Sequence, residues 1–534
     1  MAGKTDLPAL PASLEDQTHF DPLTGVLSVD HRARFNPVLT SWLETQRVNG
    51  HVIQVTAVEP GEVARLRAGQ KAPEFATKID DTFRLRARDL LSRAAAYGTN
   101  DVHLRVGETG AILYFAIHNR LRVAERLSAT EGKRLVRTWY QGVAEVTDTS
   151  YLESMFQGGQ IPGDIFPEEL GVDSARIQRG PCYPQHQHAE FMTIRVQFKG
   201  GHRNAVVNEA LPYPAPPPGK MLLPEMGFTP SNMEKLLYLL DCPTGLVLFT
   251  GPTGSGKTTT IYQFLTELLR QRPYLNVVTA EDPPEIPIPG AVQLPIVNAH
   301  SKESIADAYN NAITTMLRMA PHVILIGEIR HGAVAESALE AAITGHKVGS
   351  TMHIDDALEF VDRFELLGRG SAILNRRMIC DPRKIRGIVA QRLLGHLCDQ
   401  CAIPLKEAQR GSNRLQTPTR LLRALENWGS LDAVRILGPG CKACNHTGLK
   451  GRYAVAEIIV TDTELMQDYI EHGTATARER YRARADADPS LLHAAIDRCL
   501  AGEIEPLEIE TIDTIPAHRD KNFKPLLSSL SSVR

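Results

Sequence analysis

The most informative segment of the sequence is Gly251-Pro252-Thr253-Gly254-Ser255-Gly256-Lys257-Thr258. It fits the phosphate-binding pattern G-x-x-x-x-G-K-[ST]. The apolar run 245–250 precedes it, and an apolar-periodic segment, 259–269, follows it, as a strand and a helix would. This strand–turn–helix context argues against a chance glycine-rich turn. We therefore predict a P-loop nucleotide site within an α/β fold.

Each residue type in this segment suits a triphosphate with Mg²⁺. Glycines let the backbone curl so that successive N–H groups point at phosphate oxygens, and the following helix adds its positive dipole end. Lys257 is expected to reach the β- and γ-phosphates, and the Thr258 hydroxyl is expected to bind Mg²⁺. The residues that we assign to nucleotide binding are Gly251, Pro252, Thr253, Gly254, Ser255, Gly256, Lys257, Thr258 and Thr259.

Two further apolar strands are predicted to end in acidic residues. Residues 277–280 run into Glu281, and residues 323–326 run to Glu328 after one glycine. Ligands of open α/β sheets bind at this carboxyl edge, where a carboxylate can orient a metal ion or activate water. We predict Lys257, Glu281 and Glu328 as catalytic residues and favour Glu281 for activating the water. The sequence alone leaves open which glutamate is the general base.

His353 follows residues 349–352, which are expected to end another strand. At the carboxyl edge of the sheet it could contact the γ-phosphate or an acidic neighbour and so sense the nucleotide state. A purely structural histidine fits the residues equally well. We include His353 among the predicted nucleotide-binding residues.

Four of the eight cysteines form two Cys-x-x-Cys pairs, Cys398 with Cys401 and Cys441 with Cys444. Each pair places two thiolates on a tight turn, and two such turns can complete a tetrahedral Cys₄ zinc site. No ligand position is left open for water, so we predict a structural Zn²⁺. The 39 residues between the pairs exceed the spacing of compact zinc ribbons. Four free thiols remaining from a lost site are therefore the alternative.

Composition limits the class of protein. The 534 residues exceed one ordinary domain, and 43% apolar with 23% charged residues is typical of a folded chain. A net charge of -3 argues against a protein that coats nucleic acid. No apolar stretch is long enough to cross a bilayer, and the first residues lack the apolar core of a signal peptide. We expect a cytoplasmic protein that reaches a membrane only through a partner.

Proline density marks a boundary in the chain. Prolines cannot continue a helix or a sheet ladder, so their cluster predicts a semi-rigid linker. The divisions that we predict are 1–82 as an N-terminal adaptor, 83–210 as a smaller α+β domain, 211–220 as the linker, 221–460 as the P-loop ATPase domain with a zinc subdomain at about 396–448, and 461–534 as a helical region. In the predicted helical region, four arginines are interpreted as a solvated helix face: Arg478, Arg480, Arg482 and Arg484.

Residues 223–451 resemble the type II secretion and type IV pilus assembly ATPases. The similar elements occur in the order of that family and cover nearly half of the chain. They are the P-loop extended through Thr259 and Thr260, the box Glu281-Asp282-Pro283-Pro284-Glu285, the Walker B segment 323–330, the histidine box from Thr344-Gly345-His346 to His353, Ala390-Gln391-Arg392-Leu393-Leu394, and both cysteine turns. Asp101-Val102-His103 extends a weaker likeness into the preceding domain.

The resemblance implies a RecA-like domain preceded by a PAS-like domain, a homo-hexamer with ATP between these domains, and zinc at the four cysteines. Turnover would move a polytopic inner-membrane platform protein and thereby drive out pilin or pseudopilin subunits. The cysteine turns favour an assembly motor over the retraction motors of the superfamily. The resemblance also implies arginines from the PAS-like domain that reach the γ-phosphate. The candidates are Arg176, Arg179 and Arg195, and we assign Arg195.

Some residues depart from the family pattern. His322 and His331 stand where aspartates are common, and Ile354-Asp355 replaces Thr-Asn. Two other functions share the same motifs. The first is a nucleic-acid translocase, against which the near-neutral charge and the lack of an aromatic-basic stripe argue, so that no nucleic-acid partner is expected. The second is a zinc-stapled scaffold that only binds nucleotide.

Overall fold

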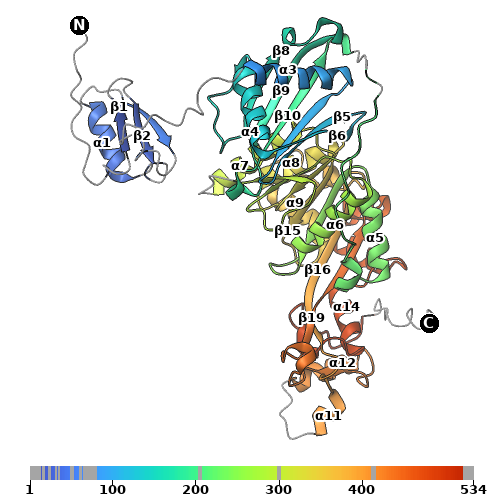
Figure 1. The fold of residues 1–534 in the computed structure, drawn as a ribbon. Helices are drawn as coiled ribbons and strands as arrows, with labels where there is room; N and C mark the ends of the chain where they lie inside the picture. The colour runs from blue at the N-terminus through green and yellow to red at the C-terminus, as the bar shows by residue number, and fades with distance from the viewer. Residues whose placement is uncertain are drawn as a thin grey trace, which may run out of the picture. The chain divides into compact units, whose positions relative to one another are not determined.

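The computed structural model describes residues 81–520 apart from 202–206, 208, 297–301 and 411–416. Before residue 81 it describes only 14, 18–21, 26–30, 33, 36–48, 53–58 and 63. The chain divides into two compact units, Met1–Phe83 and Arg84–Arg534 (Figure 1). Most of the predicted adaptor, including the first residues, and the last part of the predicted helical region, 521–534, lie outside the described residues.

The first unit has a small α/β arrangement in its described part. Its elements are β1 (Thr18–Asp21), β2 (Val26–Asp30), α1 (Pro37–Val48) and β3 (Gln54–Val58). Strand β2 pairs antiparallel with β1 and parallel with β3, and the parallel pair is joined through the α1 segment. Leu27, Val29 and Leu39 are buried together, which gives this unit a core of its own.

Helix α3 (Asp81–Ala96) crosses the division between the two units. The second unit then contains a seven-stranded antiparallel sheet in the order β6-β5-β4-β10-β9-β8-β7. Its further elements are β4 (Asp101–Val106), β5 (Ala111–Ile117), β6 (Arg120–Leu127), α4 (Ala129–Arg137), β7 (Val146–Thr147), β8 (Gln157–Pro162), β9 (Val172–Pro181) and β10 (Glu190–Phe198). The PAS-like assignment of this region stays a prediction.

A second seven-stranded sheet carries the P-loop, in the order β13-β12-β14-β15-β11-β16-β19. The strands are β11 (Gly245–Thr250), β12 (Val277–Glu281), β13 (Ala291–Pro295), β14 (Val323–Ile326), β15 (Lys347–Met352), β16 (Ile385–Leu397) and β19 (Leu449–Val460). All neighbours are parallel except β19, which runs antiparallel to β16. Six strands of this sheet are therefore parallel, and β19 is its antiparallel edge strand.

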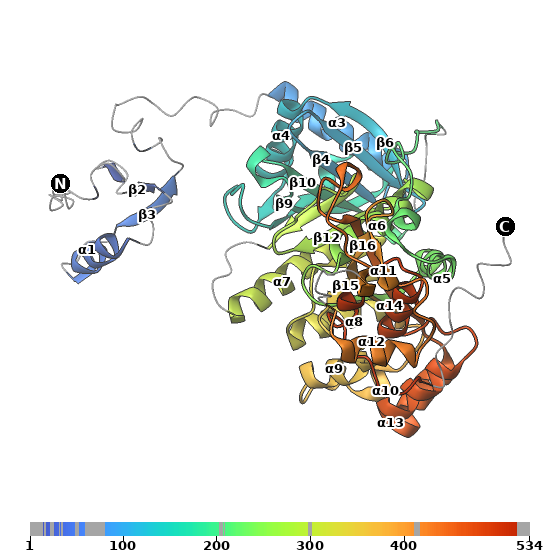
Figure 2. The same cartoon turned by 90° about the horizontal axis from the view of Figure 1, so that it is seen from below.

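Alternation along the strands gives the sheet two buried faces. Helices α5 (Pro230–Asp241) and α6 (Lys257–Gln271) pack on the face that contains Val247 and Phe249. On the other face lie α7 (Lys302–Leu317), α8 (Gly332–Ile343) and α9 (Phe360–Leu367). Figure 2 shows α5 and α7 on opposite sides of β12 and β15. This layering explains why β11 and β14 are apolar at nearly every position.

Beyond the sheet, β16 and β19 extend together toward α11 and α12 (Figure 1). The remaining elements include α10 (Arg376–Ile379), β17 (Ile403–Pro404), α11 (Leu405–Arg410), α12 (Thr419–Glu426), β18 (Arg435–Ile436), η11 (Lys442–Cys444), α13 (Thr463–Ala483), α14 (Leu491–Leu500) and α15 (Pro506–Ile509). In the described part of the chain, no helix combines the length and apolarity needed to cross a bilayer.

Candidate functional site

The P-loop lies between β11 and α6, at the carboxyl end of the central strand. Gly251, Gly254 and Gly256 have φ angles of 140°, 78° and 86°, which side-chain-bearing residues rarely adopt. A Cβ atom on Gly251 would lie 2.5 Å from the Gln391 carbonyl oxygen and 2.8 Å from Ser255 Oγ. The loop is therefore shaped by the absence of side chains at these positions.

We expect Gly251→Ala to reshape this loop. The added methyl group must displace the Gln391 backbone, or the backbone of residue 251 must adopt another φ angle. Either change costs about 1–3 kcal/mol of stability. Because the distorted loop binds phosphate less well, the affinity for nucleotide should also fall, and titration calorimetry measures this change. Gly370→Ala is the matched control, because Gly370 also has a positive φ of 86° but open space around its Cβ position. Equal nucleotide affinity of the Gly251 variant and the parent would contradict this account.

Lys257 begins α6 and lies over the loop that precedes it. Its Nζ donates to the carbonyl oxygens of Gly251 and Pro252 at 2.8 and 2.9 Å. An ammonium group has three donors, so one remains for a phosphate oxygen. Burial lowers the pKa of Lys257, and the nearby Arg392 acts in the same direction, whereas Glu328 opposes them.

A cavity of about 470 Å³ adjoins the P-loop. Its walls include Thr253 to Thr259 together with Glu281, Glu328 and His353. The predicted catalytic residues thus come together from the ends of β12, β14 and β15. Gly251 and Pro252 form the start of the loop outside this wall.

Arg195 does not line this cavity within one chain. Its Nε lies 2.8 Å from Asp101 Oδ1, beside a second hollow between β10 and Pro321. Arg179 is fully buried and pairs with Glu190 at 3.2 Å, and Arg176 is exposed on β9. None of the three candidate arginines reaches the P-loop of its own chain.

Glu281 is held in place at the end of β12. Its Oε1 accepts hydrogen bonds from Thr279 Oγ1 at 2.5 Å and from Gln293 Nε2 at 2.9 Å. Burial raises the pKa of Glu281, although these two hydrogen bonds oppose that change. Sequence analysis did not identify Gln293, because a lone glutamine in a strand belongs to no motif.

Glu328 and His353 form a pair across the cavity. His353 Nε2 lies 3.2 Å from Glu328 Oε1, and Arg330 Nε lies 2.6 Å from the same oxygen. Burial lowers the pKa of His353, and Lys257 lowers it further. A neutral imidazole can donate a hydrogen bond to the carboxylate and hold its orientation.

The donors around the cavity fit a triphosphate with Mg²⁺. The Ser255 hydroxyl is buried without a protein partner, and Thr258 and Thr259 are exposed toward the cavity. Hydroxyl and carboxylate oxygens are the hard ligands that Mg²⁺ prefers. Gln391 Nε2 donates to the Ser255 carbonyl at 2.7 Å and supports the loop from β16.

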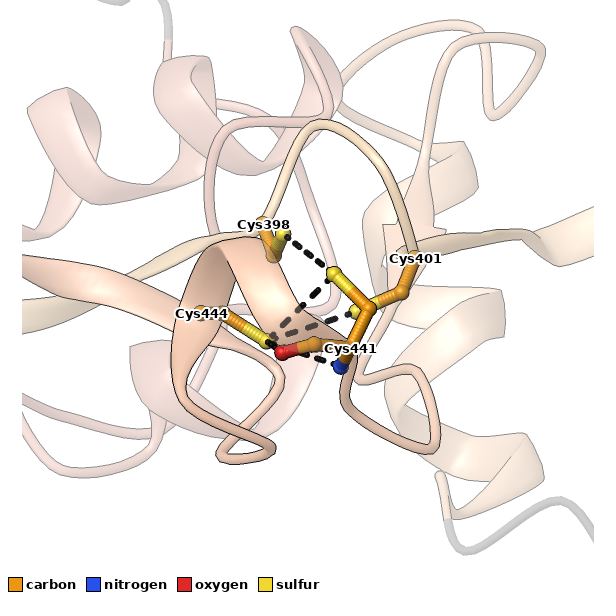
Figure 3. A group of neighbouring side chains, drawn as sticks. All are labelled: Cys398, Cys401, Cys441 and Cys444. Atoms are coloured by element: carbon orange, nitrogen blue, oxygen red, sulfur yellow. Dashed lines mark hydrogen bonds between the residues drawn. The ribbon is translucent and has the colours of Figure 1, made fainter.

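The four paired cysteines converge at the far ends of β16 and β19 (Figure 3). All four sulfur atoms lie within 4.8 Å of one another. Three of the distances are 3.8 Å: Cys398 to Cys441, Cys401 to Cys444, and Cys441 to Cys444. A tetrahedron with Zn–S bonds of about 2.3 Å has edges of about 3.8 Å. The sulfur geometry therefore fits Zn²⁺.

Backbone N–H groups in the second cysteine turn stabilise the thiolate form of Cys444, which is the form that binds a metal cation. Cys444 Sγ accepts hydrogen bonds from the N–H groups of Cys441 and Gly448 at 3.1 and 3.2 Å. The donor from Cys441 is the main cause that lowers the pKa of Cys444 to about 6. Gly440 and Gly448 adopt φ angles of 87° and 78° that permit the turn. Thiolates held in this way are metal ligands.

One interpretation of the sequence is wrong for two of the four arginines that it covered. The arginines of α13 and of its C-cap residue, Arg484, do not form a uniformly solvated face, because Arg482 and Arg484 have side-chain exposures of 22% and 14%. Arg482 pairs with Asp356 and Glu457, and Arg484 pairs with Asp462. Their acidic partners lie at least 20 positions away in the sequence, so no local charge pattern indicates these pairs.

The fold and the P-loop geometry define an α/β protein of the P-loop class. The family described as "Type II/IV secretion system protein" matches residues 217–511, more than half of the chain, and the chain belongs to this family. The resemblance expected from the sequence motifs is thereby confirmed.

Individual relatives agree with this membership. The chain is 31% identical over 398 residues to the type II secretion system protein HxcR of Pseudomonas aeruginosa, covering 74% of this chain and 70% of HxcR. It is 33% identical over 253 residues to the type IV pilus assembly ATPase PilB of Thermus thermophilus, covering 47% of this chain and 26% of PilB. Among solved structures, the pilus retraction motor PilT with bound ADP aligns with 18% identity and a TM-score of 0.39, covering 80% of this chain and 97% of PilT.

Proposed function

We propose that this protein hydrolyses ATP and uses the energy to assemble a type IV-like pilus or a type II secretion pseudopilus. The observation that carries the proposal is the convergence of Lys257, Glu281, Glu328 and His353 on one cavity beside the P-loop. Membership of the secretion ATPase family supports the motor role.

The chain's residues have separate roles in this proposal. Lys257 and the P-loop backbone bind the phosphates, and the Thr258 hydroxyl holds Mg²⁺. When bound, Mg²⁺ neutralises charge on the phosphates. Glu281 accepts the proton of the attacking water, and Glu328 orients the metal or the water with His353 beside it. Zn²⁺ at the four cysteines stabilises the fold and takes no part in hydrolysis.

Exchanging each glutamate separately tests this division of roles. Glu281→Gln removes the base and should lower kcat by about 10²-fold while ATP still binds. Glu328→Gln should lower kcat and also weaken the dependence of ATP binding on Mg²⁺. Single-turnover hydrolysis and calorimetry with and without Mg²⁺ distinguish the two variants. If only Glu328→Gln slows the chemical step, the base is Glu328 and our assignment of Glu281 is wrong.

The raised pKa of Glu281 predicts an acid limb in the pH profile of kcat. The carboxylate works as a base only when it has lost its proton. Because burial raises its pKa, activity should already fall at a pH above the ordinary range of carboxyl groups. Rate measurements from pH 5 to 9 on the parent and on Glu281→Gln test this. A limb of the same shape in the variant would exclude Glu281 as its origin.

The oligomeric state, location and partners of the protein belong to the same proposal. We propose a homo-hexamer at the cytoplasmic face of the inner membrane, bound there through a polytopic platform protein, which acts on pilin or pseudopilin. Arg195 would then serve the nucleotide site only through a movement of its domain or through a neighbouring chain. Co-purification with a polytopic membrane protein tests the partner. Stimulation of ATP turnover by DNA that disappears at high salt would favour a translocase instead.

A further inference from the structure

Arg482 of α13 joins two carboxylates from distant parts of the P-loop domain. Its Nη1 and Nη2 donate to the two Asp356 oxygens at 3.0 and 2.9 Å. Its Nε and Nη2 donate to the two Glu457 oxygens at 2.9 and 3.0 Å. Such forked contacts fix the relative orientation of the groups that they join. We call Asp356, Glu457 and Arg482 the carboxylate clamp.

The clamp is built from groups that need one another. The Glu457 side chain is only 2% exposed, and burial raises its pKa. Burial also lowers the pKa of Arg482, but Glu457 and Asp356 outweigh that effect and raise it above its ordinary value. Removing one member would leave a buried charge without its partner, which is strongly unfavourable. The clamp therefore has one well-defined geometry.

Asp356 connects the clamp to the nucleotide site. It lies three residues after His353. Its Oδ1 accepts a hydrogen bond from the Leu358 N–H group at 3.0 Å and so caps the start of η10 (Ala357–Glu359). Arg478 Nη1 also donates to Asp356, at 3.1 Å. The Tyr469 hydroxyl of α13 donates to the Leu358 carbonyl at 2.6 Å. Helix α13 thus fixes the chain directly beyond His353.

Glu457 connects the clamp to the other end of the domain. It lies on β19, the strand that follows the second cysteine turn and pairs with β16. The Arg482 guanidinium therefore connects the segment that follows His353 to β19, the strand that begins after the second cysteine turn. Among the described residues, Arg478 pairs with Asp356 and Glu359, and Arg480 pairs with Asp468, so neither of these ion-paired arginines reaches β19.

We propose that Arg482 is a positioning residue that holds His353 against Glu328 by fixing Asp356. This inference rests on the proposed ATP hydrolysis. Arg482 does not line the nucleotide cavity, so it acts on the reaction only through the loop that carries His353. The expected signature is a loss of kcat with little change in KM, because the P-loop contacts remain.

A double-mutant cycle tests the proposal. Arg482→Lys keeps one positive charge but loses the fork, and it should lower kcat by about 10- to 100-fold, as small displacements of reacting groups do. In a His353→Ala background the same change should lower kcat by less than about twofold, since its target is already absent. Equal effects in both backgrounds, or a rise in KM with unchanged kcat, would overturn the proposal.

Two further variants keep the result interpretable. Arg480→Lys changes an arginine on the same helix that pairs with Asp468 and does not touch Asp356, so its kcat should match the parent. If Arg482→Lys fails to fold, Asp356→Asn replaces it in the cycle, because an amide oxygen can still cap η10. A parent that does not hydrolyse ATP would instead refute the proposed function.

Discussion

Replacing Lys257 by alanine is expected to lower kcat for ATP hydrolysis by about 10³-fold or more, the range over which cations act on phosphoryl transfer. The ammonium is partly buried at the head of α6 and has a donor to spare for phosphate. No other lysine lines the cavity among the described residues, so none can substitute. Steady-state phosphate release measures the loss.

A matched control separates chemistry from charge. Lys220→Ala removes a surface ammonium that pairs with Glu225 far along the sequence from the P-loop, and its activity should equal that of the parent. The thermal midpoints of both variants should stay close to the parent value. Parent-like hydrolysis by the Lys257 variant would remove Lys257 from the mechanism.

Loss of zinc is the second large effect that we expect. The purified protein should contain one Zn²⁺ per chain. The Cys444→Ser variant should lose this Zn²⁺ during dialysis. The affinity for Zn²⁺ should fall by more than the roughly 10- to 100-fold that is lost when a hydrogen-bond partner of a metal ligand is removed. Because binding energy at structural zinc sites is folding energy, residues 398–448 should become sensitive to protease in the variant. Metal analysis and limited proteolysis measure both results.

The control for this experiment is another cysteine. Cys380→Ala changes a buried thiol outside the cluster and should leave the zinc content unchanged. If the parent protein contains no zinc and resists proteolysis equally with and without chelator, the four cysteines are free thiols and the structural metal is refuted.

The P-loop and its neighbours could be predicted because their signals are local. An apolar strand, a glycine turn and a helix follow one another directly, so residues 245–271 define their own arrangement. Strand-end acids such as Glu281 and Glu328 share an edge because parallel strands align their carboxyl ends. The cysteine pairs are likewise recognisable by spacing alone.

The features that the sequence did not reveal depend on distant partners. The antiparallel pairing of β19 follows from the return of the chain after the cysteine turns, and strand patterns alone do not encode direction. Gln293 supports Glu281 through a contact between neighbouring strands. Arg482 was misjudged for the same reason, since its carboxylates come from a loop and a strand remote in sequence.

The most direct test of the central claim is a crystal structure with Mg²⁺ and a non-hydrolysable ATP analogue. The account predicts the triphosphate within the turn of residues 251–258, its terminal phosphate near Lys257, and the metal near Thr258. Glu281 and Glu328 should face that phosphate. A nucleotide bound elsewhere, or a P-loop that stays empty at saturating analogue, would contradict the claim that this chain is an ATP-driven motor.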